Sequence, residues 1–487
     1  MTAARAAARV VIVGAGPVGL LLAGELRRAR VPVVVLERLA APMTESRAGQ
    51  LTALTAELLH ERGLGGLLAE AAREPRAHFA GLGFDLSGLD SPYAGNWKVP
   101  QYRTEAVLGE HAERLGATLL RAHELTGITE LPDHVVCTVQ GPEGGELRIS
   151  ARYVVGCDGA GSTVRELRGF PVSTAPATKE LLRADVAGLE IRDRRFERLE
   201  AGFAVAATRA GVTRVMVHAF GHGAAGRTGP PEFGEVARLW EKVTGEDISG
   251  GTALWTDSFD NARGQADTYR QGRVLLAGDA AHWHMPVGGQ SLNVGLQDAV
   301  NLGWKLAGTV HGRAAAGLLD SYHDERHPVA ARVLAHVAAQ DLLMLGGPEV
   351  EPLRAVLSEL IDLEQVRMHL AAFAANLGDR YGGGGSALTG RRIAGLGLRT
   401  ESGPLETAAT EPVLVRLTPS VEPLKGLGRF TVPTIHAIDE EGSLPGITTV
   451  LLRPDGYVAW ADDGEEDLDL AVGKLLRAEG STANAEF

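Results

Sequence analysis

The fold of this chain is decided by the stretch Val10-Val11-Ile12-Val13-Gly14-Ala15-Gly16-Pro17-Val18-Gly19. Its first four residues are apolar and β-branched, which predicts a buried strand that stops at Gly14. The run Leu20–Ala29 predicts a helix, and the run Val31–Leu36 predicts a second strand. Glycines between such a strand and helix let a helix N-terminus approach a pyrophosphate closely. The stretch therefore predicts a βαβ dinucleotide-binding unit with contacts from Gly14, Gly16 and Gly19.

The second strand is followed by Glu37, at roughly the 20-residue distance where such units carry an acidic residue. The carboxylate can accept hydrogen bonds from a ribose diol, and it disfavours a 2′-phosphate, so NADP is not the nucleotide expected in this unit. The alternative is a purely structural turn with a solvated glutamate. The strand and helix on either side of the turn favour the nucleotide site.

Composition and charge narrow the class of protein. The chain has 487 residues, 45% of them hydrophobic and 22% charged, which suits a globular protein of two or three domains. Its net charge of -13 argues against nucleic acid or an anionic membrane as the main partner. The apolar run Val10–Gly24 is too short for a membrane span and is broken by glycines. Cys137 and Cys157 are too few for a disulfide framework, so we expect a cytoplasmic protein.

Two further signals each place an aspartate at the end of an apolar strand. Tyr153–Gly156 leads to Asp158-Gly159, and Arg273–Ala277 leads to Gly278-Asp279. An Asp-Gly pair alone is most often a simple turn. Here the preceding strands and the order of the signals favour a cofactor site over a simple turn for both pairs. Asp279 is suited to hold flavin ribityl hydroxyls. Together with the first stretch they outline a single FAD site.

A glycine loop follows Asp279. Pro286–Asn293 contains Gly288 and Gly289 and leads into a predicted helix at Gln297–Leu306. A helix N-terminus offers free N–H groups and a partial positive charge, which suits the negative charge of a reduced flavin. The two glycines allow a close backbone approach to the ring. A plain loop before a packing helix would explain the helix but not the glycines.

These stretches together resemble the class A flavoprotein aromatic hydroxylases with the p-hydroxybenzoate hydroxylase fold. Within them the chain is most similar to actinomycete aromatic polyketide hydroxylases that act on angucyclinones and anthracyclines, with the rifampicin monooxygenases as a related group. Other matching stretches include Glu37–Leu39, Ser46–Ala48 and Leu452–Gly456. The resemblance implies FAD contacts at Val18, Glu37, Arg38, Arg47, Gln101, Leu125, Asp158, Asp279, Gly289, Leu292 and Asn293.

The expected fold class is α/β, with a Rossmann-like FAD-binding domain, an inserted mixed β-sheet substrate domain and a thioredoxin-like C-terminal domain. The expected FAD-binding domain comprises residues 1–76, 99–175 and 265–385, and the substrate domain residues 77–98 and 176–264. The alternating stretch Arg214–Phe220 predicts the inserted sheet. Its expected pocket residues are Phe79, Phe84, Trp97, Trp255 and Phe259, and for each of them ordinary core packing is the alternative.

The last unit is expected at residues 390–487, after the flexible run Gly382–Gly385. Strands at Thr448–Leu452 and Tyr457–Trp460 flank a Pro-Asp-Gly turn. The unit resembles the thioredoxin-like tail of these hydroxylases but contains no cysteine. A redox role is therefore excluded, and a structural role and a subunit contact, including a homodimer, both stay open.

The resemblance implies an NAD(P)H- and O2-dependent monooxygenase that hydroxylates a polycyclic aromatic polyketide in antibiotic or pigment tailoring. NADPH, preferred over NADH, would reduce FAD while bound only transiently, and a C4a-hydroperoxyflavin would deliver the oxygen. Backbone groups of the glycine loop would serve this chemistry, at Pro286, Gly288, Gly289 and Gln290. His282 and His284 have no third ligand at metal spacing, so no metal is expected.

Two alternatives stay open. The same fold can perform Baeyer-Villiger insertion or oxidative ring opening, including inactivation of rifamycin-type compounds. A non-catalytic flavin-binding interaction protein is the second alternative, and it would not oxidise NADPH faster when an aromatic polyketide is added.

Overall fold

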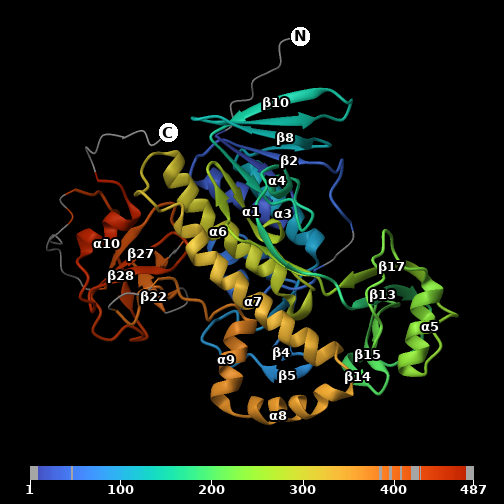
Figure 1. Ribbon diagram of the computed structural model, residues 1–487. Helices are drawn as coiled ribbons and strands as arrows, with labels where there is room; N and C mark the ends of the chain where they lie inside the picture. The colour runs from blue at the N-terminus through green and yellow to red at the C-terminus, as the bar shows by residue number, and fades with distance from the viewer. Residues whose placement is uncertain are drawn as a thin grey trace.

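A six-stranded sheet forms the centre of the molecule (Figure 1), in the order β19-β20-β11-β1-β2-β7. The computed structural model describes residues 9–44, 48–382, 386–393, 397–405, 408–417, 427 and 429–478. Five strands of the sheet run parallel, and β19 is antiparallel to β20. The strands are β1 Val10–Val13, β2 Val33–Glu37, β7 Thr118–Arg121, β11 Tyr153–Gly156, β19 Arg270–Gln271 and β20 Val274–Leu276.

The helix α1 (Pro17–Arg28) packs between α3 (Gln101–Arg114) and the long helix α6 (Gln290–Val310). It begins three residues before the predicted start because Pro17 suits the first helical position, where no N–H partner is needed. The helix α6 begins at Gln290, before the predicted Gln297, so part of the predicted loop is its first turn. The βαβ unit predicted from the sequence is confirmed.

The segment between β11 and β20 contains an inserted antiparallel sheet of five strands, which lies at one side of the central domain (Figure 1). Its order is β14-β15-β16-β13-β17, and α5 (Phe233–Thr244) packs on β16 and β15. The strands are β13 Glu180–Ala187, β14 Arg194–Leu199, β15 Gly202–Arg209, β16 Val212–Ala219 and β17 Thr252–Asp260. A smaller sheet of β12 (Val172–Ala175), β18 (Arg263–Ala266) and β21 (His282–Trp283) leads back to the glycine loop.

An earlier excursion of the chain forms two hairpin-like pairs near the inserted sheet. One pairs β3 (Ala72–Glu74) with β6 (Asn96–Lys98), and the other pairs β4 (Arg76–Phe79) with β5 (Leu82–Asp85). The helix α9 (Glu364–Ala374) packs on β4 and β5. The other α-helices and strands before the C-terminal unit are α2 Ala53–Glu61, β8 Glu124–Glu130, β9 Val135–Gln140, β10 Glu146–Ala151, α4 Thr163–Leu167, α7 Ser321–Leu345 and α8 Glu351–Ile361.

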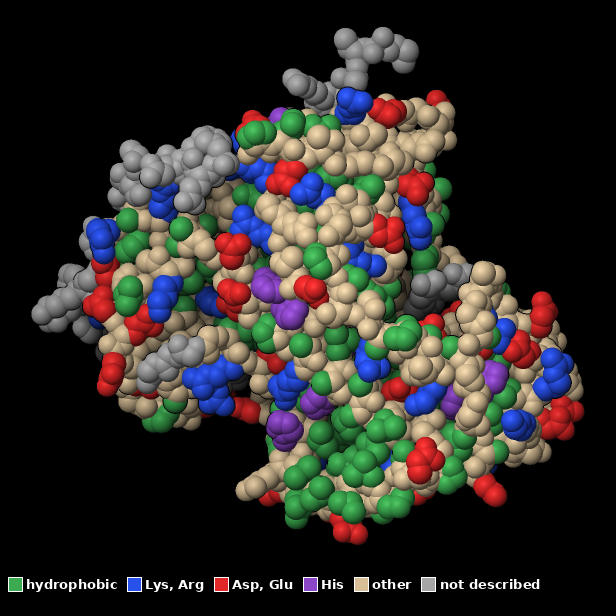
Figure 2. All heavy atoms as spheres, in the orientation of Figure 1, with side chains coloured by type: hydrophobic (Ala, Val, Ile, Leu, Met, Phe, Trp, Pro, Cys, Tyr) green, Lys and Arg blue, Asp and Glu red, His purple; other side chains and the backbone are tan. Residues whose placement is uncertain are grey.

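Two helices are notable for their apolar residues: α7, which crosses the middle of the molecule, and α8, which lies at the base of Figure 1. The helix α7 has the length and composition of a membrane span, but 50% of its most apolar window is buried inside the fold, as in a core helix. The helix α8 exposes Leu353, Val356 and Leu360, and Leu363 follows it. Figure 2 shows the apolar side chains gathered over this end of the molecule.

The C-terminal unit is a four-stranded sheet with a helix, docked on α6 and α7. The sheet order is β25-β24-β27-β28, with β25 Thr434–His436, β24 Val413–Arg416, β27 Thr449–Leu452 and β28 Val458–Ala461, followed by α10 Leu468–Leu475. A small sheet contains β22 Leu398–Thr400, β23 Gly403–Pro404 and β26 Ile438–Asp439. Residues Gly383–Gly385 of the predicted connector lie outside the described residues.

Buried charges attach this unit to the rest of the protein. Arg453 donates to both oxygens of Glu325 on α7, at 2.7 Å each. Asp455 accepts from Trp304 Nε1 of α6 at 3.2 Å, and Lys305 of α6 donates to Glu325 at 2.7 Å. These buried charged side chains form hydrogen bonds with partners of opposite charge. Such pairing is the condition for burying charge without a large cost in free energy. The C-terminal unit therefore has a structural attachment to the central domain.

Candidate functional site

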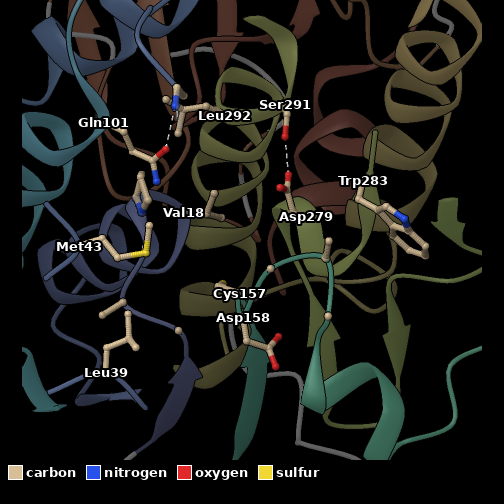
Figure 3. Close-up of a pocket in the computed structure, with 18 of the residues that line it drawn as sticks. Val18, Leu39, Met43, Gln101, Cys157, Asp158, Asp279, Trp283, Ser291 and Leu292 are labelled. Carbon is tan, nitrogen blue, oxygen red and sulfur yellow. Dashed lines mark hydrogen bonds between the residues drawn. The ribbon is translucent and has the colours of Figure 1, made fainter. Parts of the chain in front are cut away.

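A large cavity, here called cavity 1, runs from the glycine turn after β1 to the inserted sheet. Its volume is about 810 Å³, within the range of cofactor sites. Figure 3 shows Gln101, Met43 and Leu39 along one side of it and Asp279, Ser291 and Trp283 along the other. The ends of β1, β2, β11 and β20 all open into this space, as expected for a ligand site of a parallel sheet.

The glycine turn can be built only with glycine at two points. Gly14 has φ +103°, and a Cβ there would lie 2.4 Å from the carbonyl oxygen of Cys157. A Cβ on Gly19 would lie 2.1 Å from the oxygen of Gly14, so this glycine allows α1 to approach β1. Gly16 lines cavity 1 and a Cβ there would meet nothing within 4 Å. The first two glycines therefore serve the fold, while Gly16 leaves open space for a ligand.

The acid after β2 is tied to the same turn. Glu37 Oε2 accepts a hydrogen bond from Ala15 N at 2.8 Å, and Oε1 accepts from Leu39 N at 2.9 Å. These bonds hold the carboxylate at the mouth of the turn, where it lines cavity 1. Such a carboxylate is placed to accept hydrogen bonds from a ribose diol.

The two later aspartates lie at the ends of β11 and β20. Asp158 accepts from Ser162 Oγ at 2.5 Å and from Val164 N at 3.1 Å, and burial raises the pKa of this carboxyl above its usual 3.8. Asp279 accepts from Ser291 Oγ at 2.5 Å, a bond drawn in Figure 3. Both side chains line cavity 1, as does the glycine turn after β1. The structure thus brings together three sequence signals that are far apart in the chain.

A buried charge cluster beneath Asp279 was not found from the sequence. Asp298 of α6 accepts from Arg326 Nε at 2.6 Å, from the Gly278 N–H at 3.1 Å and bonds His282 Nε2 at 2.7 Å. Burial alone would raise the pKa of Asp298, but Arg326 and His282 outweigh it and hold the pKa below 3.8. Arg326 also donates to the Tyr381 hydroxyl at 2.7 Å. The cluster fixes the loop that carries Asp279, and it accounts for His282 without a metal.

The glycine loop borders a second cavity as well. Gly288 (φ +71°) and Gly289 (φ +68°) are left-handed, and a Cβ on Gly289 would lie 2.3 Å from Gln50 Nε2. Pro286 and Ser291 line cavity 1, whereas Gly288 and Gln290 line the second space, here called cavity 2. Asn293 clamps the loop, because Nδ2 donates to Gly289 O at 2.7 Å and Oδ1 accepts from Thr52 N at 2.9 Å. The loop is thus the element that the two cavities share.

Cavity 2 has a volume of about 300 Å³ and an aromatic lining. Its rings are Phe79 and Phe84 of the β4–β5 pair, Phe196 of the inserted sheet and Phe373 of α9. The His78 ring lies 3.9 Å from that of Phe196, and burial lowers the pKa of His78 to about 4. Flat apolar walls of this kind suit a planar ligand.

The structure separates the predicted cofactor residues into groups. Those that line cavity 1 are Gly14, Gly16, Val18, Glu37, Arg38, Gln101, Leu125, Asp158, Asp279 and Leu292, together with the loop residue Pro286. Gly19 and Asn293 pack beside the cavity, and Gln290 is held by Asn376 Nδ2 at 2.7 Å. Arg47 lies outside the described residues.

The predicted pocket residues also divide. Phe79 and Phe84 line cavity 2, and Phe259 lines cavity 1. Trp97 lines neither cavity, because its ring packs on the central core and its Nε1 donates to Tyr93 O at 3.0 Å. Trp255 also lines neither, and its ring lies 4.7 Å from the Arg183 guanidinium. Trp283 lines cavity 1, and Gln50 and Phe196 line cavity 2; none of the three was predicted, because no local sequence motif marks them.

The chemistry of cavity 1 fits FAD. A glycine turn, an N-terminal helix end and a carboxylate meet at one end, and Asp279 lies at the other. His284 lines the cavity, and its buried Nε2 has no partner among the described residues, while the other ring nitrogen bonds Met285 O at 2.7 Å. Burial lowers the pKa of His284, so the neutral ring offers Nε2 as an acceptor to a bound group. Within the described ranges, no group of three or more potential metal ligands occurs.

Comparison with known proteins agrees with this geometry. Residues 7–337 match the family model described as FAD binding domain. Residues 386–478 match the model described as aromatic-ring hydroxylase, C-terminal. The two matches cover the central domain with its inserted sheet and the docked C-terminal unit.

Similar proteins extend over almost the whole chain. The 12-dehydrotetracycline 5-monooxygenase/anhydrotetracycline 6-monooxygenase of Streptomyces rimosus is 39% identical, over 94% of this chain and 96% of that protein. Rifampicin monooxygenase of Streptomyces venezuelae is 38% identical, with the same two coverages of 94% and 96%. The structure of CabE, an aromatic hydroxylase from angucycline biosynthesis, superimposes with a TM-score of 0.90 at 42% identity, over 96% of this chain and 98% of that one.

Proposed function

The chain belongs to the family of FAD-dependent aromatic-ring hydroxylases, and from that premise we propose that it hydroxylates a polycyclic aromatic polyketide in antibiotic or pigment tailoring. The observation that carries the proposal is the shared glycine loop. It borders cavity 1, which the glycine turn and Glu37 line, on one side and the aromatic-lined cavity 2 on the other. The tetracycline and angucycline enzymes among the similar proteins support a fused aromatic substrate.

The residues assigned to FAD divide by the part of the cofactor that their chemistry suits. We assign Gly14, Gly16 and Glu37 to the adenosine and pyrophosphate end, and Asp279 to the ribityl hydroxyls. Val18, Arg38, Arg47, Gln101, Leu125, Asp158, Leu292 and Asn293 complete the assigned set. Bound FAD supplies the activation of dioxygen for insertion into the substrate.

The protein's own contribution is to position the substrate against the flavin and to exclude water from the site. Pro286, Gly288, Gly289 and Gln290 would lie at the reacting edge of the flavin, with a glycine backbone that admits close approach. Buried Phe84 and the other rings of cavity 2 would hold the substrate plane and displace water. We therefore assign residues 77–98 and 176–264 to substrate binding, and residues 1–76, 99–175 and 265–385 to FAD binding.

The reductant is proposed to be NADPH in preference to NADH, and the oxidant O2. Glu37 reserves the βαβ unit at β1–α1–β2 for the flavin nucleotide, so we propose that the pyridine nucleotide binds elsewhere and leaves after reduction. Comparison of kcat/KM for the two nucleotides tests the preference. Equal values or a higher value for NADH would contradict it.

The central experiment measures NADPH oxidation and oxygen uptake by the purified yellow holoenzyme with a panel of tricyclic and tetracyclic phenols. We expect at least one phenol to accelerate both, with incorporation of one oxygen atom from ¹⁸O2. NMR connectivity of the product then separates a new C–OH bond from Baeyer-Villiger insertion or ring opening, which are the competing outcomes. NADPH oxidation that no phenol accelerates would contradict the proposal.

We also propose a cytoplasmic location and a homodimer for this protein. A cytoplasmic location agrees with Cys137 and Cys157, which are both buried and unpaired. A homodimer would cover the exposed apolar face of α8. Light scattering of the purified protein tests the dimer, and a monomeric mass at micromolar concentration would contradict it.

A further inference from the structure

Cavity 2 contains one partly buried cation, Lys98, at the end of β6. Its Nζ donates to Gln50 Oε1 at 2.9 Å, and no ion pair joins it to a carboxylate among the residues that the structure describes. Burial lowers the pKa of Lys98 below the ordinary 10.5, while Glu74 acts in the opposite direction. A partly buried ammonium whose hydrogen-bond partner is a neutral amide can bind an incoming anion.

The other charges around cavity 2 do not neutralise Lys98. Glu74 pairs with Arg195 at 2.6 Å, and the pair lies toward the surface. Arg76 adds a second cation to the lining. The His78 ring stays neutral near pH 7, because burial, together with Lys98 and Arg195, lowers its pKa to about 4. The lining therefore carries an excess of positive charge among aromatic walls.

Lys98 is also connected to the glycine loop. Gln50 accepts from Lys98 through Oε1, and its Nε2 donates to Gly288 O at 3.3 Å. The same amide fills the space that a Cβ on Gly289 would need. One side chain thus separates the ammonium from the loop at which the flavin is proposed to react.

We propose that Lys98 binds the ionised hydroxyl of a fused phenolic substrate in cavity 2 and so sets which edge of the substrate faces the glycine loop. This inference rests on the proposed function and names the substrate class of the same site: acidic polycyclic phenols and enols. The hydroxyl proton passes to solvent on binding. The resulting oxyanion enriches the ring carbons ortho and para to it in electrons, which favours attack on an electrophilic oxygen.

The test uses 1,2-dihydroxyanthraquinone, whose absorption band moves to longer wavelength when a hydroxyl ionises. It is titrated into the FAD-loaded wild type and into the variants Lys98→Met, Lys98→Arg and Lys242→Met, without NADPH. Lys242 lies on the exposed surface of α5 and serves as the matched loss of one positive charge. The non-ionisable control ligand is 1,2-dimethoxyanthraquinone, and flavin content shows that each variant is folded.

The wild type and Lys242→Met should bind the probe as its anion at a pH where the free probe is neutral. Lys98→Met should lose the long-wavelength band and bind the probe about 10- to 100-fold more weakly, and Lys98→Arg should restore the band. Binding of the dimethoxy ligand should change less than about threefold in every variant.

Three results would overturn the inference. They are a wild type that binds only the neutral probe, a wild type that does not bind the probe, and a Lys98→Met variant that keeps both the band and the affinity. None of these depends on turnover, so they are distinct from a failure of the proposed function, in which phenols bind but accelerate no NADPH oxidation.

Discussion

Cavity 1 and cavity 2 meet at one loop but are built in different ways. Cavity 1 is lined by backbone at glycine turns and by acids that follow strands, such as Glu37 and Asp158. Cavity 2 is lined by side chains from the β4–β5 pair, the inserted sheet and α9, including Phe79, Phe196 and Phe373. A cofactor site made of turns constrains the residue type at each position, whereas a pocket made of rings constrains only its combined shape. Substitutions in cavity 1 should therefore lower the stability of the protein by straining the backbone. Substitutions in cavity 2 should instead weaken binding of the substrate.

The largest effect is expected from Asp298→Asn, which removes the charge beneath cavity 1. Arg326 would be left buried without its carboxylate, at a cost of about 3–5 kcal/mol in the free energy of unfolding. Urea unfolding followed by far-UV circular dichroism measures the loss, and flavin content should fall with it. The matched control is Asp320→Asn, which opens an exposed ion pair with Arg270 and should cost less than about 1 kcal/mol.

The same residue gives a pH dependence with a defined sign. Because the folded protein holds the pKa of Asp298 below 3.8, its ionised form contributes stability that is complete above pH 3.8 and is lost as the pH falls further. Wild type should lose this contribution in acid, and Asp298→Asn should not. Parallel pH curves for the two proteins below pH 4 would contradict the assignment.

The next largest effect is a difference in stability between alanine substitutions at two glycines of the same turn. Gly14→Ala would force a Cβ to 2.4 Å from Cys157 O at a positive φ, which should cost about 2–4 kcal/mol of stability. Gly16→Ala has open space and φ -72°, so it should cost less than about 1 kcal/mol and yet weaken FAD binding. Thermal unfolding of the apoproteins and FAD titration report the two quantities separately. Equal losses of stability would show that Gly16 serves the fold as well.

Cavity 2 should respond in KM and leave the flavin unchanged. Phe79→Ala removes one wall, and we expect KM for an accepted phenol to rise about tenfold, equivalent to about 1.4 kcal/mol of apolar contact. FAD affinity should stay within a factor of two. Trp255→Ala is the control, because this ring lines neither cavity and packs on Arg183. A larger rise in KM for Trp255→Ala than for Phe79→Ala would show that the substrate lies against β17 of the inserted sheet and not in cavity 2.

The smallest effect tests backbone strain beside cavity 2. Ala80 is fully buried with φ +52°, and its N–H donates to Gln340 Oε1 at 3.1 Å. Ala80→Gly relieves the left-handed conformation but adds freedom to the unfolded chain, so stability should change by no more than about 1 kcal/mol, with a gain expected. Differential scanning calorimetry measures the change. A loss above 1 kcal/mol would show that the Ala80 methyl contributes packing that outweighs its strain.

Much of cavity 1 could be predicted from the sequence because its constraints are local. Gly14 and Gly19 are required by contacts within one strand-turn-helix unit, and Glu37 ends the next strand. Element boundaries were less well predicted: α6 begins at Gln290, earlier than its apolar stripe indicated, because Gly289 in the left-handed region caps it. The Asp298–Arg326 pair was missed because no short motif joins α6 to α7.

The sequence by itself determined the βαβ unit. It also determined the order of the glycine turn Gly14–Gly19, the pair Asp158-Gly159 and the pair Gly278-Asp279, and the family that these stretches resemble. Only the tertiary structure decided that Phe79 and Phe84 line a cavity while Trp97 and Trp255 line neither. It also decided that Lys98 lines this cavity with Gln50, and not a carboxylate, as its hydrogen-bond partner among the described residues. The physical reason is the range of the constraints. A turn is fixed by the φ angles and Cβ clashes of neighbouring residues, whereas a pocket is fixed by side chains that meet only after several separate segments have packed together.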